Sequence, residues 1–159
     1  MTESTLSGVK HSILADDPAS EWLGIEVHTV STGQATISMT LRREMLNGFG
    51  MAHGGMIFAF ADTAFALACN PAEPSPQEAG LITVAAGADI NFLKPAFQGQ
   101  RLTAVAGLRS TAGRSGLYDI QVFAADPQSA GSPATPPDGS EFGELIAEFR
   151  GRSRTIAKK

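Results

Sequence analysis

The stretch with the greatest capacity for chemistry runs from Asn47 to Asp62. It holds His53, Gly54 and Gly55, followed by an apolar run over 56–69 whose only charge is Asp62. Two glycines at the start of a helix let a ligand approach its unpaired N–H groups and the positive end of its dipole. Such N–H groups can stabilise a developing oxyanion, and a carboxylate in an apolar run is costly to bury unless it is paired or functional. The pattern indicates an oxyanion site with an acid nearby.

The spacing between the glycines and the acid adds a constraint. Asp62 follows Gly55 by seven residues, which returns it to nearly the same helix face but about 10 Å further along the axis, at ~1.5 Å per residue. A carbonyl bound at the start of the same helix would be hard for this carboxylate to reach. A second, antiparallel copy of the helix would close that distance. We therefore predict a composite site to which a partner subunit contributes Asp62, and hence at least a homodimer.

The elements that position these residues follow from periodicity. Alternating apolar residues predict a hairpin over 25–30 and 35–41, and the run over 56–69 predicts a helix buried on most sides, ended by Asn70-Pro71. Further strands are expected at 81–93, 101–109, 117–124 and 144–156, after a helical lead-in over 1–23 and with a long hairpin loop over 126–143. A helix without a clear polar face is packed most economically by a sheet that wraps around it. We expect a single α+β domain over 1–159 with an antiparallel sheet around one long central helix, the hotdog fold.

Composition limits the classes of function. Hydrophobic residues make up 43% of the chain and charged residues 18%, which is typical of a packed globular domain. The net charge of −4 argues against a broad nucleic-acid surface, and no apolar run approaches the roughly 20 residues of a membrane span. With one cysteine, Cys69, and three scattered histidines, neither a disulfide nor a metal site is expected. We expect a cytoplasmic protein with neither nucleic-acid nor membrane partners.

Longer segments carry a family resemblance. Residues 45–48, 53–58, 61–66 and 68–70 resemble the phenylacetic-acid-degradation thioesterases, the PaaI group of hotdog proteins, and 90–97 with Gly99, 116–120 and 149–151 match further. The resemblance covers 20–125 and 143–156. It is specific because the motif is long and falls on the expected turn, helix and strands, whereas a bare His-Gly-Gly would be weak.

The resemblance implies roles for four catalytic candidates. The position matching Gly54 polarises the thioester carbonyl through its N–H group. The acid matching Asp62 acts across the dimer interface, either as a general base on water or as the nucleophile. The residues matching Asn47 and His53 line the thioester and orient it or the water.

The resemblance also implies how substrate is held. Gly55 would lie beside the bound thioester, and Lys94, Arg114 and Ser115 are candidates for contact with the phosphates of CoA. CoA enters as part of the substrate, and neither a metal nor a redox cofactor is expected. Homotetramers are expected by likeness to the family.

The function expected from this reading is hydrolysis of an aromatic acyl-CoA of phenylacetyl or hydroxyphenylacetyl type. Alternatives are a broad aryl- or medium-chain thioesterase, and a non-catalytic acyl-CoA-binding protein, which would be expected to lack an acid at position 62. A hotdog dehydratase would need a His and an acid arranged to remove a proton next to a carbonyl, and no second acid is placed for that in the sequence. The apolar side chains of Met56, Phe58, Phe60 and Phe65 suit an aromatic acyl group, but they equally suit a core.

Each site residue also has a structural interpretation. Asp62 could be a carboxylate paired with an arginine or capping a strand, since ion-pair networks also shelter buried acids. His53 could be a hydrogen-bonded turn residue, and Asn47 could occupy a left-handed turn position before Gly48.

Overall fold

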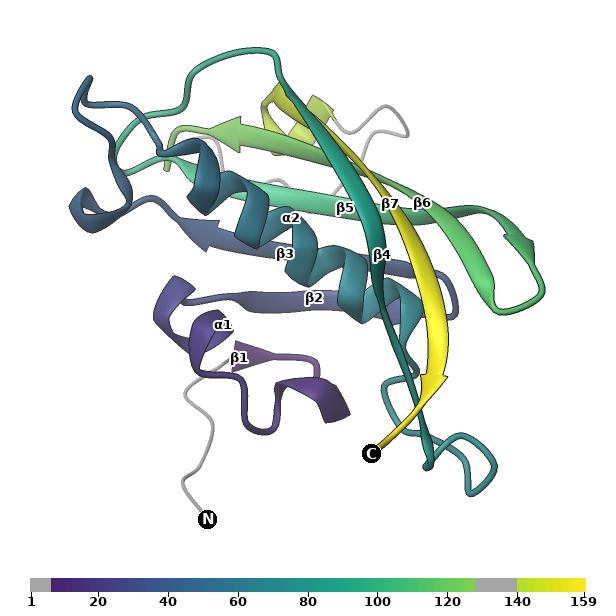
Figure 1. Cartoon of the computed structure of the whole chain (residues 1–159). Helices are drawn as coiled ribbons and strands as arrows, with labels where there is room; N and C mark the ends of the chain where they lie inside the picture. Colours follow the sequence, from purple (N-terminus) through teal and green to yellow (C-terminus); the bar gives the residue numbers. More distant parts are fainter. Residues whose placement is uncertain (1–6, 128–139) are drawn as a thin grey trace.

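The computed structural model describes residues 7–127 and 140–159, in which a curved sheet wraps around one long helix, α2 (Figure 1). Hotdog architecture of the α+β class is therefore confirmed. The elements, in order, are β1 (Ser7–Gly8), η1 (Ser12–Leu14), α1 (Pro18–Leu23), β2 (Glu26–Ser31), β3 (Gln34–Thr40), η2 (Arg43–Met45), α2 (Gly54–Cys69), β4 (Leu81–Phe92), β5 (Arg101–Ala112), β6 (Ser115–Ala125), η3 (Ser140–Phe142) and β7 (Glu144–Ala157).

The sheet has seven strands in the order β1-β2-β3-β5-β6-β7-β4. All neighbours are antiparallel except β1, which pairs parallel to β2 through two residues and was not anticipated. Strand β4 follows α2 in the chain but pairs only with β7, so it lies at one end of the sheet. Its second edge is open within the described part of the chain.

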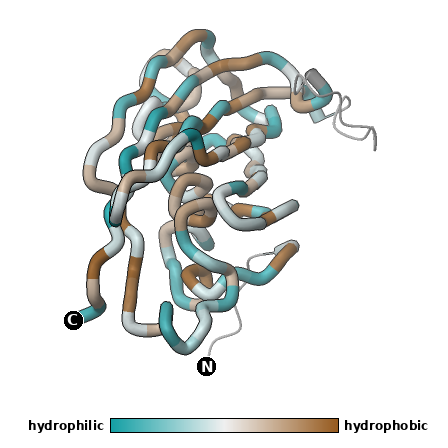
Figure 2. The backbone as a smooth tube through the Cα atoms, turned by 90° about the vertical axis from the view of Figure 1, so that its right-hand side faces the viewer, coloured by the Kyte–Doolittle hydropathy of each residue, from teal (hydrophilic) through white to brown (hydrophobic). Residues whose placement is uncertain are grey.

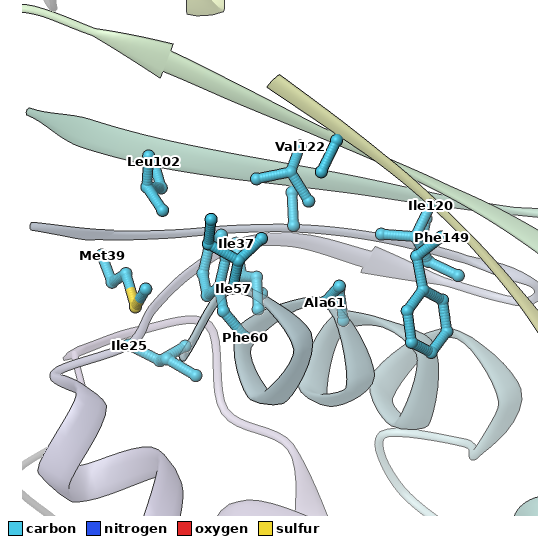
Figure 3. Close-up of a cluster of buried hydrophobic side chains, with 14 of the residues drawn as sticks. Ile25, Ile37, Met39, Ile57, Phe60, Ala61, Leu102, Ile120, Val122 and Phe149 are labelled. Carbon is cyan, nitrogen blue, oxygen red and sulfur yellow. The ribbon is translucent and has the colours of Figure 1, made fainter. Parts of the chain in front are cut away.

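The core fills the space between α2 and the concave side of the sheet (Figure 3). Along β3, β5 and β6 the side chains alternate between the two faces of the sheet, as a strand period of two requires, and Figure 2 shows hydrophobic and hydrophilic residues interspersed along the backbone. Ile37, Leu102 and Ile120 are fully buried and belong to the same core cluster as the helix residue Phe60. At Gly151 of β7, an added Cβ would lie 2.8 Å from the Phe65 ring, so a glycine there lets the helix pack closely on the strand.

The helix boundaries differ slightly from the expected ones. Helix α2 begins at Gly54, two residues before the expected start, because His53 caps it and glycine costs little in the first turn, where no intrahelical N–H bond is lost. Helix α1 is capped by Asp17 and ends at Gly24, whose φ of 71° is left-handed. Of the loop expected over 126–143, residues 128–139 lie outside the described residues, and the segment before β7 forms η3. Within the described residues, no helix combines the length and apolar character that crossing a bilayer requires.

Candidate functional site

The start of α2 exposes one unpaired backbone donor. The Gly55 N–H donates to Nδ1 of His53 at 3.0 Å, and the N–H groups of Met56 and Ile57 donate to the His53 carbonyl oxygen at 2.9 and 3.2 Å. Only the N–H of Gly54 has no partner among the described residues. A helix start leaves four N–H groups without an i→i−4 partner, here those of His53, Gly54, Gly55 and Met56. The His53 N–H donates to the Met45 carbonyl oxygen at 2.8 Å, so three of the four are used and that of Gly54 is available to an anionic oxygen.

His53 is both a helix cap and a source of a further donor. Because its Nδ1 accepts the Gly55 N–H, the neutral ring carries its proton on Nε2. The side chain is exposed, so this Nε2–H points to a group outside the helix or to solvent. His53 can therefore cap the helix and also serve in the site. Capping fixes the tautomer with the proton on Nε2, and that N–H is the donor that the site role uses.

Asn47 lies in the loop that leads into α2, and its amide orientation is fixed by backbone donors. Its Oδ1 accepts from the N–H groups of Phe49 and Met51 at 2.9 and 3.2 Å. Its Nδ2 has no partner among the described residues, so the free end of the side chain is a donor. The interpretation of Asn47 as a left-handed turn residue is wrong, because the positive φ in this loop belongs to Gly50, at 77°.

Asp62 is half-buried in the middle of α2 and has neither a hydrogen bond nor an ion pair to any described residue. Burial raises the pKa of its carboxyl group. The alternative of an arginine-paired structural acid therefore has no support within the described chain. Burial and, to a smaller extent, the charge of Asp62 raise the pKa of the Cys69 thiol to about 12, so Cys69 stays a neutral thiol.

Within one chain, the acid and the free donor are apart. Asp62 follows Gly54 by eight positions in a continuous helix, a separation of about 12 Å along the axis. One chain alone therefore does not bring the Gly54 N–H and the Asp62 carboxylate to the same carbonyl.

Phe92 is a neighbour of this site that sequence reasoning did not assign to it. A Cβ added to Gly54 would lie 3.1 Å from Cζ of Phe92, so the ring rests directly on the first residue of α2. Phe92 is the last residue of β4 and is 53% exposed. A single sequence gives no signal for this contact, because it depends on how a strand far along the chain is placed beside the helix.

The residues expected to contact CoA phosphates lie at two distant places. Lys94 follows the end of β4, near Phe92, and forms an ion pair with Glu144. Arg114 and Ser115 lie at the β5–β6 turn, where the Thr155 N–H donates to the Arg114 carbonyl oxygen at 2.9 Å. Thr155 is paired with the first residues of β4, and that strand of 12 residues spans about 40 Å at ~3.3 Å per residue. The structure thus separates Arg114 and Ser115 from the start of α2.

The aromatic residues of α2 divide between the core and the surface. Phe60 and Phe65 are 0% and 1% exposed, so their interpretation as acyl-lining residues is wrong. Phe58 is 37% exposed, and Met56 is partly exposed. Most of β4 is exposed as well, and the large apolar side chains exposed on α2, on β4 and just after it are Phe58, Leu81, Val84, Phe92 and Leu93.

Across residues 7–127 and 140–159, no group of three or more His, Cys, Asp or Glu side chains is arranged to hold a metal ion.

The fold, the free helix donor and the lone acid define a class that comparison with known proteins identifies. The family model of the Thioesterase superfamily matches residues 49–130, and the chain belongs to this family. The acyl-coenzyme A thioesterase PaaI of Escherichia coli (strain K12) is 40% identical over 146 residues, covering 92% of this chain and 88% of that protein. The predicted resemblance to PaaI thioesterases and the prediction of a thioester hydrolase are confirmed.

Solved structures agree with this assignment. The E. coli PaaI protein of the phenylacetic acid degradation operon superposes with a TM-score of 0.73 and 34% identity, over 93% of this chain and 91% of that one. A mutant of the phenylacetic acid degradation protein PaaI from Thermus thermophilus gives a TM-score of 0.68 and 29% identity, over 87% and 98%.

Proposed function

We propose that this protein is an acyl-CoA thioesterase that hydrolyses aromatic acyl-CoA, of phenylacetyl or hydroxyphenylacetyl type, to the free acid and CoA. The observation that carries the proposal is that α2 holds two complementary groups for which the described residues offer no partner, the Gly54 N–H and the Asp62 carboxylate. The aromatic preference is supported by the relative named acyl-coenzyme A thioesterase PaaI and by the operon from which its structure comes.

In the proposed reaction, the thioester carbonyl oxygen accepts the Gly54 N–H. Asp62 of the partner subunit either attacks the carbonyl carbon or removes a proton from the water that attacks it. Negative charge then develops on the carbonyl oxygen, where the N–H and the helix dipole stabilise it. The C–S bond breaks, and CoA leaves as a thiolate that takes up a proton. If water attacked, the free acid is formed directly; if Asp62 attacked, the acyl group is left on it as a mixed anhydride, which water then hydrolyses to the free acid and the Asp62 carboxylate. Nδ2 of Asn47 and Nε2–H of His53, both free donors, would orient the thioester.

The proposed site requires a homodimer. Among the described residues, strand β4 has an open edge and exposes Leu81 and Val84, and an exposed apolar edge strand is prone to pair with another chain. Pairing of β4 with β4 of a second copy would be antiparallel about a two-fold axis and would bring the two α2 helices together. Assembly of two such dimers into a homotetramer is part of the proposal and rests on likeness to the family.

The same pairing gives a place for the nucleotide of CoA. In an antiparallel β4 pair, the start of the partner's β4 lies beside the end of this one, which brings Arg114 of the partner subunit towards Gly54. Arg114 has no ion pair among the described residues, and Ser115 follows it at the same turn. Lys94 is paired with Glu144, so it would have to exchange that partner for a phosphate. We therefore assign the main phosphate contact to Arg114 and Ser115.

The chain's own groups suffice for this chemistry, so we propose that the reaction uses neither a metal nor a redox cofactor. A cytoplasmic location is also proposed, supported by a single cysteine that leaves no intrachain disulfide to form.

The proposal is tested by following release of free thiol from a panel of acyl-CoA esters. Phenylacetyl-CoA should be cleaved by the wild type and not by Asp62→Ala. Equal cleavage of aryl and medium-chain esters would favour the broad thioesterase, and tight binding without thiol release would favour a non-catalytic protein.

The composite site has its own test. Mixing inactive Asp62→Ala with inactive Gly54→Pro subunits creates mixed dimers with one intact site each, so random exchange should restore about a quarter of wild-type activity. No recovery, in mixtures shown to exchange subunits, would contradict a site shared between two chains.

A further inference from the structure

The Phe92 ring lies against Gly54, whose N–H has no partner in the part of the chain that the structure describes. Its Cζ lies 3.1 Å from the position a Cβ would take on Gly54, while the residue stays 53% exposed. One part of the ring therefore packs on the backbone of Gly54, and the rest is open. A carbonyl group held by the Gly54 N–H would place its substituents beside this open part.

The backbone around Phe92 is held firmly, so the ring is a fixed wall. Phe92 is paired with Ala147 in the β4–β7 ladder. The N–H groups of the next two residues, Leu93 and Lys94, both donate to the Ile146 carbonyl oxygen, at 2.8 and 3.2 Å. The Lys94–Glu144 ion pair adds a link from the same segment to β7. A wall that is anchored on both sides of its side chain can discriminate between acyl groups by shape.

A second exposed aromatic ring lies one turn further along α2. Phe58 follows Gly54 by four positions, on the same side of the helix, and its ring packs edge-on against Phe149 with centroids 5.2 Å apart. Phe149 is paired with Ile90, two residues before Phe92 on the same face of β4. One exposed aromatic residue from the strand therefore borders Gly54 and a second lies one turn along the helix, and the described chain contains no ring contact between the two.

We propose that Phe92 is a specificity-determining residue: its ring packs against the acyl group next to the reacting carbonyl and favours a flat aryl group over a flexible alkyl chain. The inference rests on the proposed function and deepens it by assigning the aryl preference to a residue. An aromatic contact favours a ring over an aliphatic group by roughly 2- to 10-fold. Phe92 therefore acts on the choice of substrate, while Gly54 and Asp62 act on the chemistry.

The test compares phenylacetyl-CoA with hexanoyl-CoA in Phe92→Leu. Leucine keeps an apolar side chain at the end of β4 but removes the ring. The ratio of kcat/KM values, aryl over alkyl, should fall by roughly 2- to 10-fold. Phe97→Leu is the matched control, because Phe97 is similarly exposed, at 49%, lies in the loop after β4, and is not among the atoms nearest the Cβ position of Gly54. Its ratio should stay at the wild-type value.

A purely structural role for Phe92 would lower both kcat/KM values by the same factor and leave the ratio unchanged, and that result would overturn the inference. Binding of the two corresponding non-hydrolysable ketone analogues of CoA provides a readout that does not need turnover. A wild type that binds the aryl analogue but releases no thiol would contradict the proposed function, while loss of the binding preference in Phe92→Leu would still support the inference. Unchanged binding preference in Phe92→Leu would overturn it.

Discussion

Replacing Gly54 by proline removes the N–H that has no partner within the described residues at the start of α2, and it adds a ring whose Cβ would lie 3.1 Å from Phe92. Gly54 is the first residue of the helix, a position where proline is favoured because its missing N–H has no intrahelical partner. The preceding residue, His53, has φ −65° and ψ 131°, which is the extended conformation that a following proline requires. The free energy of unfolding should therefore change by no more than about 1 kcal/mol.

The catalytic effect should be far larger than the effect on stability. The other three N–H groups of the first turn already donate to Nδ1 or to the carbonyl oxygen of His53, so none can replace the lost donor. Loss of one oxyanion donor typically lowers kcat by about 100- to 1,000-fold, or roughly 3–4 kcal/mol of transition-state stabilisation. We expect that loss for Gly54→Pro in a free-thiol release assay, with a thermal unfolding midpoint close to that of the wild type.

The control is Gly54→Ala, which adds a Cβ at the same position but keeps the N–H. That Cβ would lie 3.1 Å from the Phe92 ring, whose exposed end can move by the few tenths of an ångström required. Gly54→Ala should therefore lose less than about tenfold in kcat. Equal losses in the alanine and proline variants would assign the defect to the added Cβ, and near-normal kcat in Gly54→Pro would refute the assignment of the oxyanion donor.

Three further predictions concern single residues. Asp62→Asn should lower kcat by about 100- to 10,000-fold, because a carboxylate is needed as base or nucleophile. In the wild type, kcat should fall with decreasing pH, and the midpoint of this fall should lie above the ordinary pKa of aspartate, because burial raises the pKa of Asp62. Because the pKa of Asp62 is raised in the folded state, its charged form destabilises the fold once the pH exceeds the pKa of the unfolded state. Asp62→Asn should therefore unfold at a higher temperature than the wild type at pH 7, and this difference should vanish in acid. A variant less stable than the wild type at pH 7 would contradict the reasoning. Phe60→Ala should lower the free energy of unfolding by about 3–5 kcal/mol in urea denaturation, because Phe60 is 0% exposed, and a loss under about 1 kcal/mol would place it outside the core. Arg114→Ala should raise KM for acyl-CoA but not for the acyl ester of N-acetylcysteamine, which lacks phosphates, and parallel effects on both substrates would exclude a phosphate contact.

The secondary structure could be predicted because each element carries its own period. Alternation of apolar and polar residues with a period of two predicted the strands. The uninterrupted apolar run predicted α2 to within two residues of its start. The start was placed late because glycine is a poor helix former, although its low propensity matters little in the first turn. The order of strands could not be read in this way, because the pairing of β4 with β7 joins segments that are far apart in the sequence.

In the candidate site, too, local features could be predicted from the sequence and tertiary contacts could not. Residue type and spacing were enough to select Gly54 and Asp62, since a glycine at a helix start and an acid in an apolar helix are both unusual in sequence. The contact of Phe92 with Gly54 and the pairing of Lys94 with Glu144 depend on tertiary placement, so no local pattern announces them. Phe60 and Phe65 fit an acyl pocket by type, and only their position on the inner side of α2 assigns them to the core.

The two groups proposed to act in catalysis are both destabilising in an isolated chain. Within the described residues, the N–H of Gly54 has no acceptor, and the half-buried Asp62 carboxylate has no donor and is only partly solvated. One group is a hydrogen-bond donor and the other an acceptor, and they lie about 12 Å apart on one helix. An antiparallel copy of the same helix would place the Gly54 N–H of each chain opposite the Asp62 carboxylate of the other. One interface would then contain two such pairs. Substrate bound between the two groups would contact both chains. A ligand that binds only the assembled form stabilises it, so substrate binding should stabilise the proposed dimer, and a more stable dimer should bind substrate more tightly.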